Sequence, residues 1–146
     1  MPLTITNADV QALLSVAAQG NTLHTSSLLT ILARINRPYD EADIMLLFKD
    51  QGGNNLVHIA ANNGHPNIIT FVCAHSVFNA KPGMRQSILN ARNGTSETPI
   101  YIAAKGNHTS CVEVLAQNGV AVDAEGPFGF RIAHVAAEIG NFTMLN

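Results

Sequence analysis

Short blocks of apolar residues alternate with polar segments along the whole chain. Because each block is short, the pattern predicts a series of short helices rather than a few long ones. Pro38 and the Pro82-Gly83 pair interrupt this pattern, and Asp40 can cap the helix that follows Pro38. We expect helices at residues 8–18, 25–35, 40–48, 56–62, 66–79, 99–105, 109–118 and 132–139, with a short turn near 84–88.

Three of these blocks share one pattern of residue types. Each has a polar opening residue, two apolar residues, a His or Tyr, one apolar residue, a pair of alanines, two spacers, and a Gly or Asn. The copies are Asn55–His65, Thr98–His108 and Arg131–Asn141. The spacing is 33 residues between the second and third copies and 43 between the first and second. Self-similarity at such a period indicates stacked repeat units.

The three copies resemble the ankyrin repeat, which has a period of about 33 residues and a Thr-Pro-Leu-His-x-Ala signature. Thr98-Pro99 match that signature literally, and Cys111-Val112 and Val114-Leu115 fall where the outer helix of the repeat has its apolar pairs. The resemblance implies an all-α solenoid of helix-turn-helix units with short β-hairpin-like loops. We expect a degenerate N-terminal capping unit at 1–48 and repeats at 49–91, 92–124 and 125–146, the last incomplete.

Several positions depart from the ankyrin pattern. Ser96 stands where the hairpin usually has glycine, and Asn107 replaces the glycine of the turn between helices. Asparagine adopts left-handed backbone angles more readily than most residues, so Asn107 is a plausible substitute. The first two units also carry a 10-residue extension that the third lacks. We expect these extensions to form extra short helices between units.

Composition narrows the classes of partner. Apolar residues make up 47% of the 146 residues and charged residues 12%, so the chain has enough apolar surface to bury a core. The formal net charge is −2, and no basic stripe is interleaved with aromatic residues, which argues against a nucleic-acid partner. No apolar run approaches the roughly 20 residues that span a bilayer. The resemblance and the charge together favour a protein partner.

The histidines and cysteines suggest no catalytic, metal or cofactor site. The six histidines include no pair at metal-ligand spacing with a Glu between them, and there is no Cys-x-x-Cys motif. The resemblance instead gives His58 and His134 a role in tying neighbouring loops, and gives His65 and His108 a capping role at the outer helices. Cys73 and Cys111 fall in predicted buried helix faces, where thiols are inert. We therefore expect no enzyme and no cofactor.

The resemblance also implies where a partner binds, because ankyrin proteins contact partners through hairpin tips and exposed inner-helix positions. Phe128 and Phe130 stand out, since surface aromatic residues are favoured interface anchors; the equally weighted alternative is that one Phe folds onto a neighbouring unit. The expected contacts are Gln51, Asn54, Thr95, Glu97, Phe128 and Phe130 at the tips, and Asn62, Asn63, Lys105, Glu138 and Ile139 on the inner helices.

Two functional hypotheses follow from the sequence. In the first, the chain is a monomeric protein-binding module that uses the concave face of the array. In the second, it is the scaffold or targeting part of a longer, bacterial effector-type protein with an enzymatic segment beyond residue 146. The sequence lacks a secretory signal, so we expect a cytoplasmic location, or the host cytoplasm if the chain belongs to a secreted effector.

Overall fold

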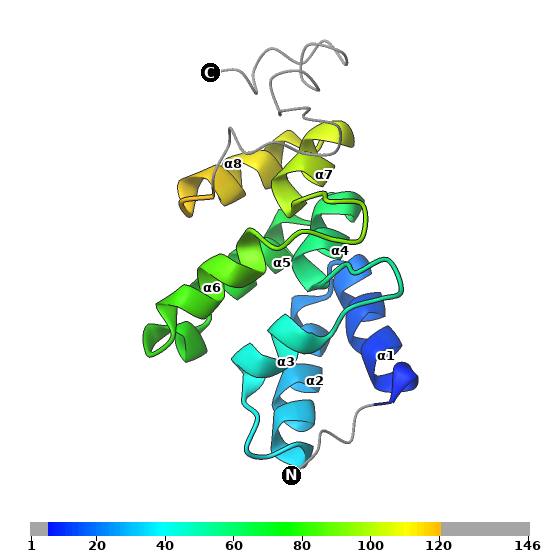
Figure 1. Cartoon of the computed structure of the whole chain (residues 1–146), viewed down its shortest axis with the longest axis vertical. Coiled ribbons are helices and arrows are strands. Elements are labelled where there is room, and N and C mark those ends of the chain that lie inside the picture. The colour runs from blue at the N-terminus through cyan, green and yellow to red at the C-terminus, as the bar shows by residue number, and fades with distance from the viewer. Residues whose placement is uncertain (1–5, 121–146) are drawn as a thin grey trace.

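The computed structural model describes residues 6–120, and every regular element in this part of the chain is a helix (Figure 1). The α-helices predicted near 8–18, 40–48, 56–62, 99–105 and 109–118 are confirmed to within about two residues at each end. The elements are α1 (Asn7–Ala18), α2 (Thr22–Ile35), α3 (Glu41–Leu47), α4 (Leu56–Asn63), α5 (Pro66–Ala74), the 3-10 helix η1 (Ser76–Asn79), α6 (Pro82–Leu89), α7 (Pro99–Lys105) and α8 (Thr109–Gln117).

The helices form stacked pairs. Figure 1 shows α1–α2, α4–α5 and α7–α8 following one another along the long axis of the molecule. The inner helices α1, α4 and α7 pack in sequence, and the outer helices α2, α5 and α8 do the same behind them. This arrangement confirms the predicted solenoid of helix-turn-helix units. The unit predicted at 125–146 lies outside the described residues.

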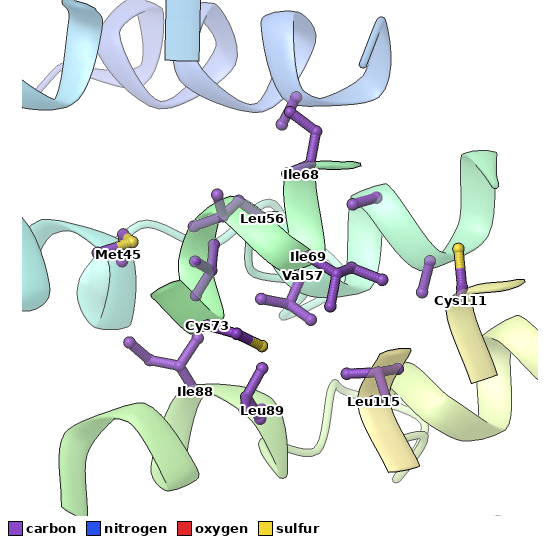
Figure 2. Close-up of a cluster of buried hydrophobic side chains, with 14 of the residues drawn as sticks. Met45, Leu56, Val57, Ile68, Ile69, Cys73, Ile88, Leu89, Cys111 and Leu115 are labelled. Carbon is purple, nitrogen blue, oxygen red and sulfur yellow. The ribbon is translucent and has the colours of Figure 1, made fainter. Parts of the chain in front are cut away.

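The core runs continuously through the stack because each unit buries apolar side chains against the next. Figure 2 shows side chains of α3, α4, α5, α6 and α8 converging, with Ile88 and Leu89 of α6 near Cys73 of α5. The alanine pairs Ala60-Ala61 and Ala103-Ala104 are completely buried. Such small side chains allow the inner helices α4 and α7 to approach closely.

Most helices begin at a polar residue that accepts a hydrogen bond from the first turn. The Asp40 side chain accepts from the amide of Asp43, and the Asp43 side chain accepts from the amide of Asp40, as a reciprocal capping box. Asn55 and Thr98 cap α4 and α7 in the corresponding positions. The predicted capping role of Asp40 is thus confirmed.

Two predicted helix boundaries and one predicted turn were wrong. The α2 helix begins at Thr22 rather than residue 25, because the Asn21 side chain accepts a hydrogen bond from the amide of His24. The helix predicted at 66–79 ends at Ala74, since His75 has an extended backbone and η1 follows. The turn predicted near 84–88 is the helix α6, with Pro82 at its first position, where a missing N–H costs nothing.

The two extensions pack against one another. The α3 helix extends the first unit and α6 extends the second, as predicted, and the two lie in contact along one edge of the stack. An ion pair of 2.6 Å joins Lys81 Nζ to Asp40 Oδ2, and so links the loop before α6 to the cap of α3. None of the helices within residues 6–120 combines the length and apolar character needed to cross a membrane.

Candidate binding surface

The loops between units have the same hydrogen-bonded geometry in both described copies. Asp50 Oδ1 accepts from the amides of Gly52 and Asn54 in the first loop. Asn93 Oδ1 accepts from the amides of Thr95 and Glu97 in the second. In each loop the same residue also pairs through its backbone amide with the carbonyl four residues on. A short polar side chain therefore closes each hairpin-like loop in place of a strand pair.

The two loops also bind each other. The amide of Gly94 donates to the carbonyl of Gly52 at 2.7 Å, and the Asn93 side-chain amide donates to Asn54 Oδ1 at 2.9 Å. Gly53 has a φ of +80°, and a Cβ atom there would lie only 2.9 Å from the nitrogen of Gly94. Glycine is therefore required at this tip both for its backbone angle and for the close approach of the next loop.

A hollow of about 160 Å³ lies between the loops and the inner helices. Its walls come from the loop residues Asn54, Asn93 and Glu97 and from α4 and α7, which contribute Ile59, Asn62, Ile102 and Lys105, with His58 at the base. We call this the concave hollow. It combines amide groups, a carboxylate, an ammonium group and two aliphatic side chains.

Glu97 and Lys105 hold the charged side of the concave hollow in place. Lys105 Nζ lies 2.7 Å from Glu97 Oε2, and Thr95 Oγ1 donates to Glu97 Oε1 at 2.8 Å. Partial burial alone would raise the pKa of Glu97, but the hydrogen bonds from Lys105, Thr95 and Asn93 outweigh burial and lower that pKa. The hydrogen bond to Glu97 raises the pKa of Lys105. Both groups are therefore charged at neutral pH.

The structure brings several predicted contact residues to this surface. Asn54, Asn62, Glu97 and Lys105 line the concave hollow together, although Asn54 and Glu97 are half-buried and largely occupied by bonds within and between the loops. The exposed residues Gln51, Asn63 and Thr95 lie in the first loop, on α4 and in the second loop, respectively. The remaining predicted contacts lie outside the described residues: Phe128, Phe130, Glu138 and Ile139.

Asn93 and Ile59 line the hollow but were missed by the sequence reasoning. Asn93 could have been found by aligning the two loops. Asn93 lies three residues before Ser96, just as Asp50 lies three residues before Gly53. Ile59 gave no such signal, because an apolar residue beside the signature histidine is read as core.

The signature histidine ties one unit to the next, as the ankyrin resemblance implied. His58 is completely buried, and its Nε2 lies 3.0 Å from the carbonyl oxygen of Glu97 in the next loop. Because a carbonyl only accepts, Nε2 carries the proton and Nδ1 accepts from the amide of Asn55. The side-chain amide of Asn55 donates in turn to the carbonyl of Ile88 in α6. One buried network thus joins α4, α6 and the second loop.

The capping role expected for His65 and His108 was wrong. Each residue stands just before an outer helix, but neither side chain makes a capping hydrogen bond. Their Nε2 atoms instead lie 2.8 Å from the carbonyl of Ala18 and 3.2 Å from that of Asn62. These carbonyls belong to the inner helices of the preceding units and lack helical partners. The two histidines therefore satisfy the ends of neighbouring helices.

The cysteines have the properties of buried core residues. Both thiols are free and buried. Burial raises the pKa of Cys111 to about 11 and raises that of Cys73 despite the opposing charge of Arg85. A protonated thiol is a poor nucleophile, so neither cysteine is activated at neutral pH. Within residues 6–120, no three His, Cys, Asp or Glu side chains lie close enough together to hold a metal ion.

Stacked helix pairs, mutually bonded loops and a histidine that reaches into the next unit define a helical-repeat protein. The sequence model of the ankyrin repeat matches residues 96–126. The nuclear factor NF-kappa-B p105 subunit of Mus musculus is 30% identical over 104 residues, which are 70% of this chain and 10% of p105. Synphilin-1 of Mus musculus is 31% identical over 85 residues, 58% of this chain and 8% of Synphilin-1. The chain belongs to the ankyrin-repeat family.

The fold also matches a solved structure. A chain in the crystal structure of the yeast ribosomal protein Rps3 in complex with its chaperone Yar1 superposes with a TM-score of 0.78. The superposition covers 96% of the present chain and 90% of that chain, at 17% sequence identity. Such a likeness shows the shared fold. The chain spans about a tenth of the length of the curated relatives that it matches.

Proposed function

We propose that the chain binds a partner protein through its concave face, with the concave hollow between the second and third units at the centre of the interface. The observation that carries this proposal is the placement of Asn62 and Lys105. Both are exposed, both border the hollow, and they come from different units that the loop contacts hold rigidly together. A surface held rigid in this way loses little conformational entropy when it binds.

The hollow favours a polar segment with a small apolar anchor. The exposed side-chain amide of Asn62 can bond a partner's backbone, while Ile59 and Ile102 supply apolar surface. The side-chain amides of Asn54 and Asn93 are already bonded within and between the loops, so they shape the hollow. The Glu97–Lys105 pair offers one charge of each sign, so the surface selects a partner by position rather than by net charge.

Photochemical cross-linking at a single engineered cysteine tests this proposal. Both native thiols are buried, whereas Asn62 is exposed. A maleimide-linked benzophenone should therefore label the folded Asn62→Cys variant at position 62. The matched control is a cysteine at Glu113, which is exposed on the outer helix α8. After irradiation in a eukaryotic cell lysate, we expect the same partner to be cross-linked at position 62 and not at position 113.

A competition step makes the outcome decisive. The double substitution Asn62→Arg and Lys105→Glu should abolish competition by unlabelled chain while leaving its thermal unfolding midpoint unchanged. Cross-linking that is equal at positions 62 and 113, or full competition by the double variant, would remove the concave face from the interface.

The second hypothesis, that the chain is the scaffold part of a longer effector-type protein, stays a prediction. It is in keeping with the matched stretches of p105 and Synphilin-1, which are 10% and 8% of those proteins. The cytoplasmic location also stays a prediction, and imaging the chain with a fluorescent tag would test it.

A further inference from the structure

The extensions build a second hollow, far larger than the concave one. It has a volume of about 750 Å³ and is bordered by the end of α2, the loop 36–40, the start of α3 and the start of η1. We call it the extension hollow. In Figure 1 the hairpin-like loops lie on the right of the molecule, whereas α6 and the loop leading into α3 lie on the left. The two hollows are therefore on different edges.

The lining of the extension hollow combines apolar and polar groups. Ala33, Pro38 and Val77 contribute aliphatic surface, and Tyr39 contributes a half-buried ring. On the same helix, α2, Ile31 and Ile35 are 49% and 63% exposed. A ligand that fits this hollow therefore carries apolar groups as well as polar ones, because a small inorganic ion would leave the apolar lining uncovered.

The carboxylates of the lining, Asp40 and Glu41, already have partners. Asp40 binds Lys81 Nζ at 2.6 Å. Glu41 Oε2 lies 2.5 Å from His75 Nε2, and Glu41 Oε1 accepts from Thr30 Oγ1 at 3.1 Å. These contacts fix both carboxylates in the wall of the hollow, which limits their repulsion of an incoming anion.

The two guanidinium groups of the lining have no such partners. Arg34 and Arg37 are exposed, and neither side chain forms a hydrogen bond or ion pair with any residue in the part of the chain from 6 to 120. A guanidinium group presents five donors in a planar fork that matches a carboxylate. Two such groups three residues apart, on and just beyond the last turn of α2, can each bind one carboxylate of a single segment.

We propose that the extension hollow is a second binding site, and that it takes a short acidic peptide segment with an aliphatic side chain between its carboxylates. The aliphatic side chain covers Ala33, Pro38 and Val77, while the carboxylates bind Arg34 and Arg37. This site is independent of the concave face, so one chain can hold two partners or two parts of one partner.

An NMR titration of the full chain tests the proposal. The probe is an eight-residue peptide, acetylated and amidated, in which glutamates flank a central leucine; its counterpart with glutamines is the control ligand. We expect saturable amide shifts at Ala33, Arg34, Tyr39 and Val77 with the glutamate peptide and none with the glutamine peptide. The double substitution Arg34→Gln and Arg37→Gln should weaken binding by about tenfold or more.

A matched variant separates this site from general electrostatic attraction and from the concave face. Lys49→Gln with Arg92→Gln removes two positive charges at exposed positions that line neither hollow and should leave the affinity within about twofold. Absent or non-saturating shifts, shifts centred on α4 and α7, or equal loss of affinity in the two double variants would overturn the proposal. The proposal would also be overturned if Arg34 and Arg37 bound phosphatidylserine vesicles more strongly than the glutamate peptide. Because concave-face cross-linking at position 62 uses different residues, either proposal can fail while the other stands.

Discussion

The second and third units have the same backbone conformation at corresponding positions, but different residues adopt it. Positions 43 apart correspond: Gly53 with Ser96, His58 with Tyr101, and Gly64 with Asn107. The φ values are +80° and +63° at the first pair and +72° and +60° at the third. Ser96 and Asn107 thus adopt the left-handed region that their glycine counterparts occupy at no steric cost. The third unit keeps the ankyrin geometry while accepting strain that the second avoids.

The two units also differ in how their interiors are held together. In the second unit, buried His58 bonds to Asn55 and to the carbonyl of Glu97. In the third, Tyr101 takes the corresponding position, and the ammonium group of Lys105 lies over its ring, 6.0 Å from the centroid. A directional buried network thus anchors the second unit, whereas apolar packing and surface contacts hold the third. We expect substitutions in the second unit to cost more.

The largest effect is expected for His58→Ala. This change removes a buried ring, takes one of two hydrogen bonds from the carbonyl of Glu97 and leaves the amide of Asn55 without its partner, so we expect a loss of about 3 kcal/mol in the free energy of unfolding. Urea denaturation followed by circular dichroism measures it. The matched change in the third unit, Tyr101→Phe, removes a hydroxyl that makes no hydrogen bond with residues 6–120 and should cost less than about 0.5 kcal/mol. Equal losses would break the comparison.

Gly53→Ala should have the next largest effect, about 2 kcal/mol of destabilisation. The added Cβ would lie 2.9 Å from the backbone nitrogen of Gly94 and would sit on a residue with φ of +80°, so crowding and backbone strain add. Ser96→Ala is the matched control, because it keeps the Cβ already present there and should change stability by less than about 0.5 kcal/mol. Comparing the two urea midpoints gives the result. A harmless Gly53→Ala would mean that the loop contact between Gly52 and Gly94 is dispensable.

His58 should also make stability depend on pH. Burial lowers its pKa below the ordinary 6.5, although hydrogen bonding to the backbone of Glu97 opposes this. Below about pH 6.5 the unfolded chain binds a proton that the folded chain does not, so the free energy of unfolding falls with decreasing pH, by at most about 1.4 kcal/mol per pH unit. Above that pH the ring is neutral in both states and contributes no slope.

Urea denaturation between pH 8 and pH 5 measures this slope. Glu97 and Asp40 have lowered pKa values and lose their stabilising effect only as the pH falls below the ordinary carboxylate range, so they contribute little in this window. His58→Gln should remove most of the slope whatever its effect on stability at pH 8. An unchanged slope in this variant would assign the pH dependence to another group.

The strained positions were predictable from sequence because the ankyrin pattern fixes where glycines belong. Ser96 and Asn107 were recognised as replacements on that basis, and both have positive φ. The start of α6 could have been predicted, because proline is favoured at the first helical position. The helix boundary near His75 was not predictable: an apolar run continues from α5 into η1, so periodicity alone could not show that His75 adopts an extended backbone. At this break Phe78 is buried and His75 contacts Glu41.

The candidate site was predictable in outline only. The pattern placed Asn62 and Lys105 on the inner helices, since local sequence determines which helix positions face outward. It could not place Asn93 against Asn54, because that contact depends on how two loops 39 residues apart meet. The extension hollow was beyond reach for the same reason. Its walls come from α2, α3 and η1, and nothing in the ankyrin pattern describes how inserted helices pack.

The smallest expected effect tests the strain in the third unit directly. Ser96→Gly should stabilise the chain by about 0.5 kcal/mol, because relief of the left-handed strain exceeds the extra flexibility that glycine gives the unfolded chain. Thermal unfolding should show a midpoint about 2 °C higher. The same substitution at exposed Ser110, which is helical in α8, should destabilise by a similar amount. If both changes destabilise, Ser96 bears no strain, and the two units differ in sequence without differing in local stability.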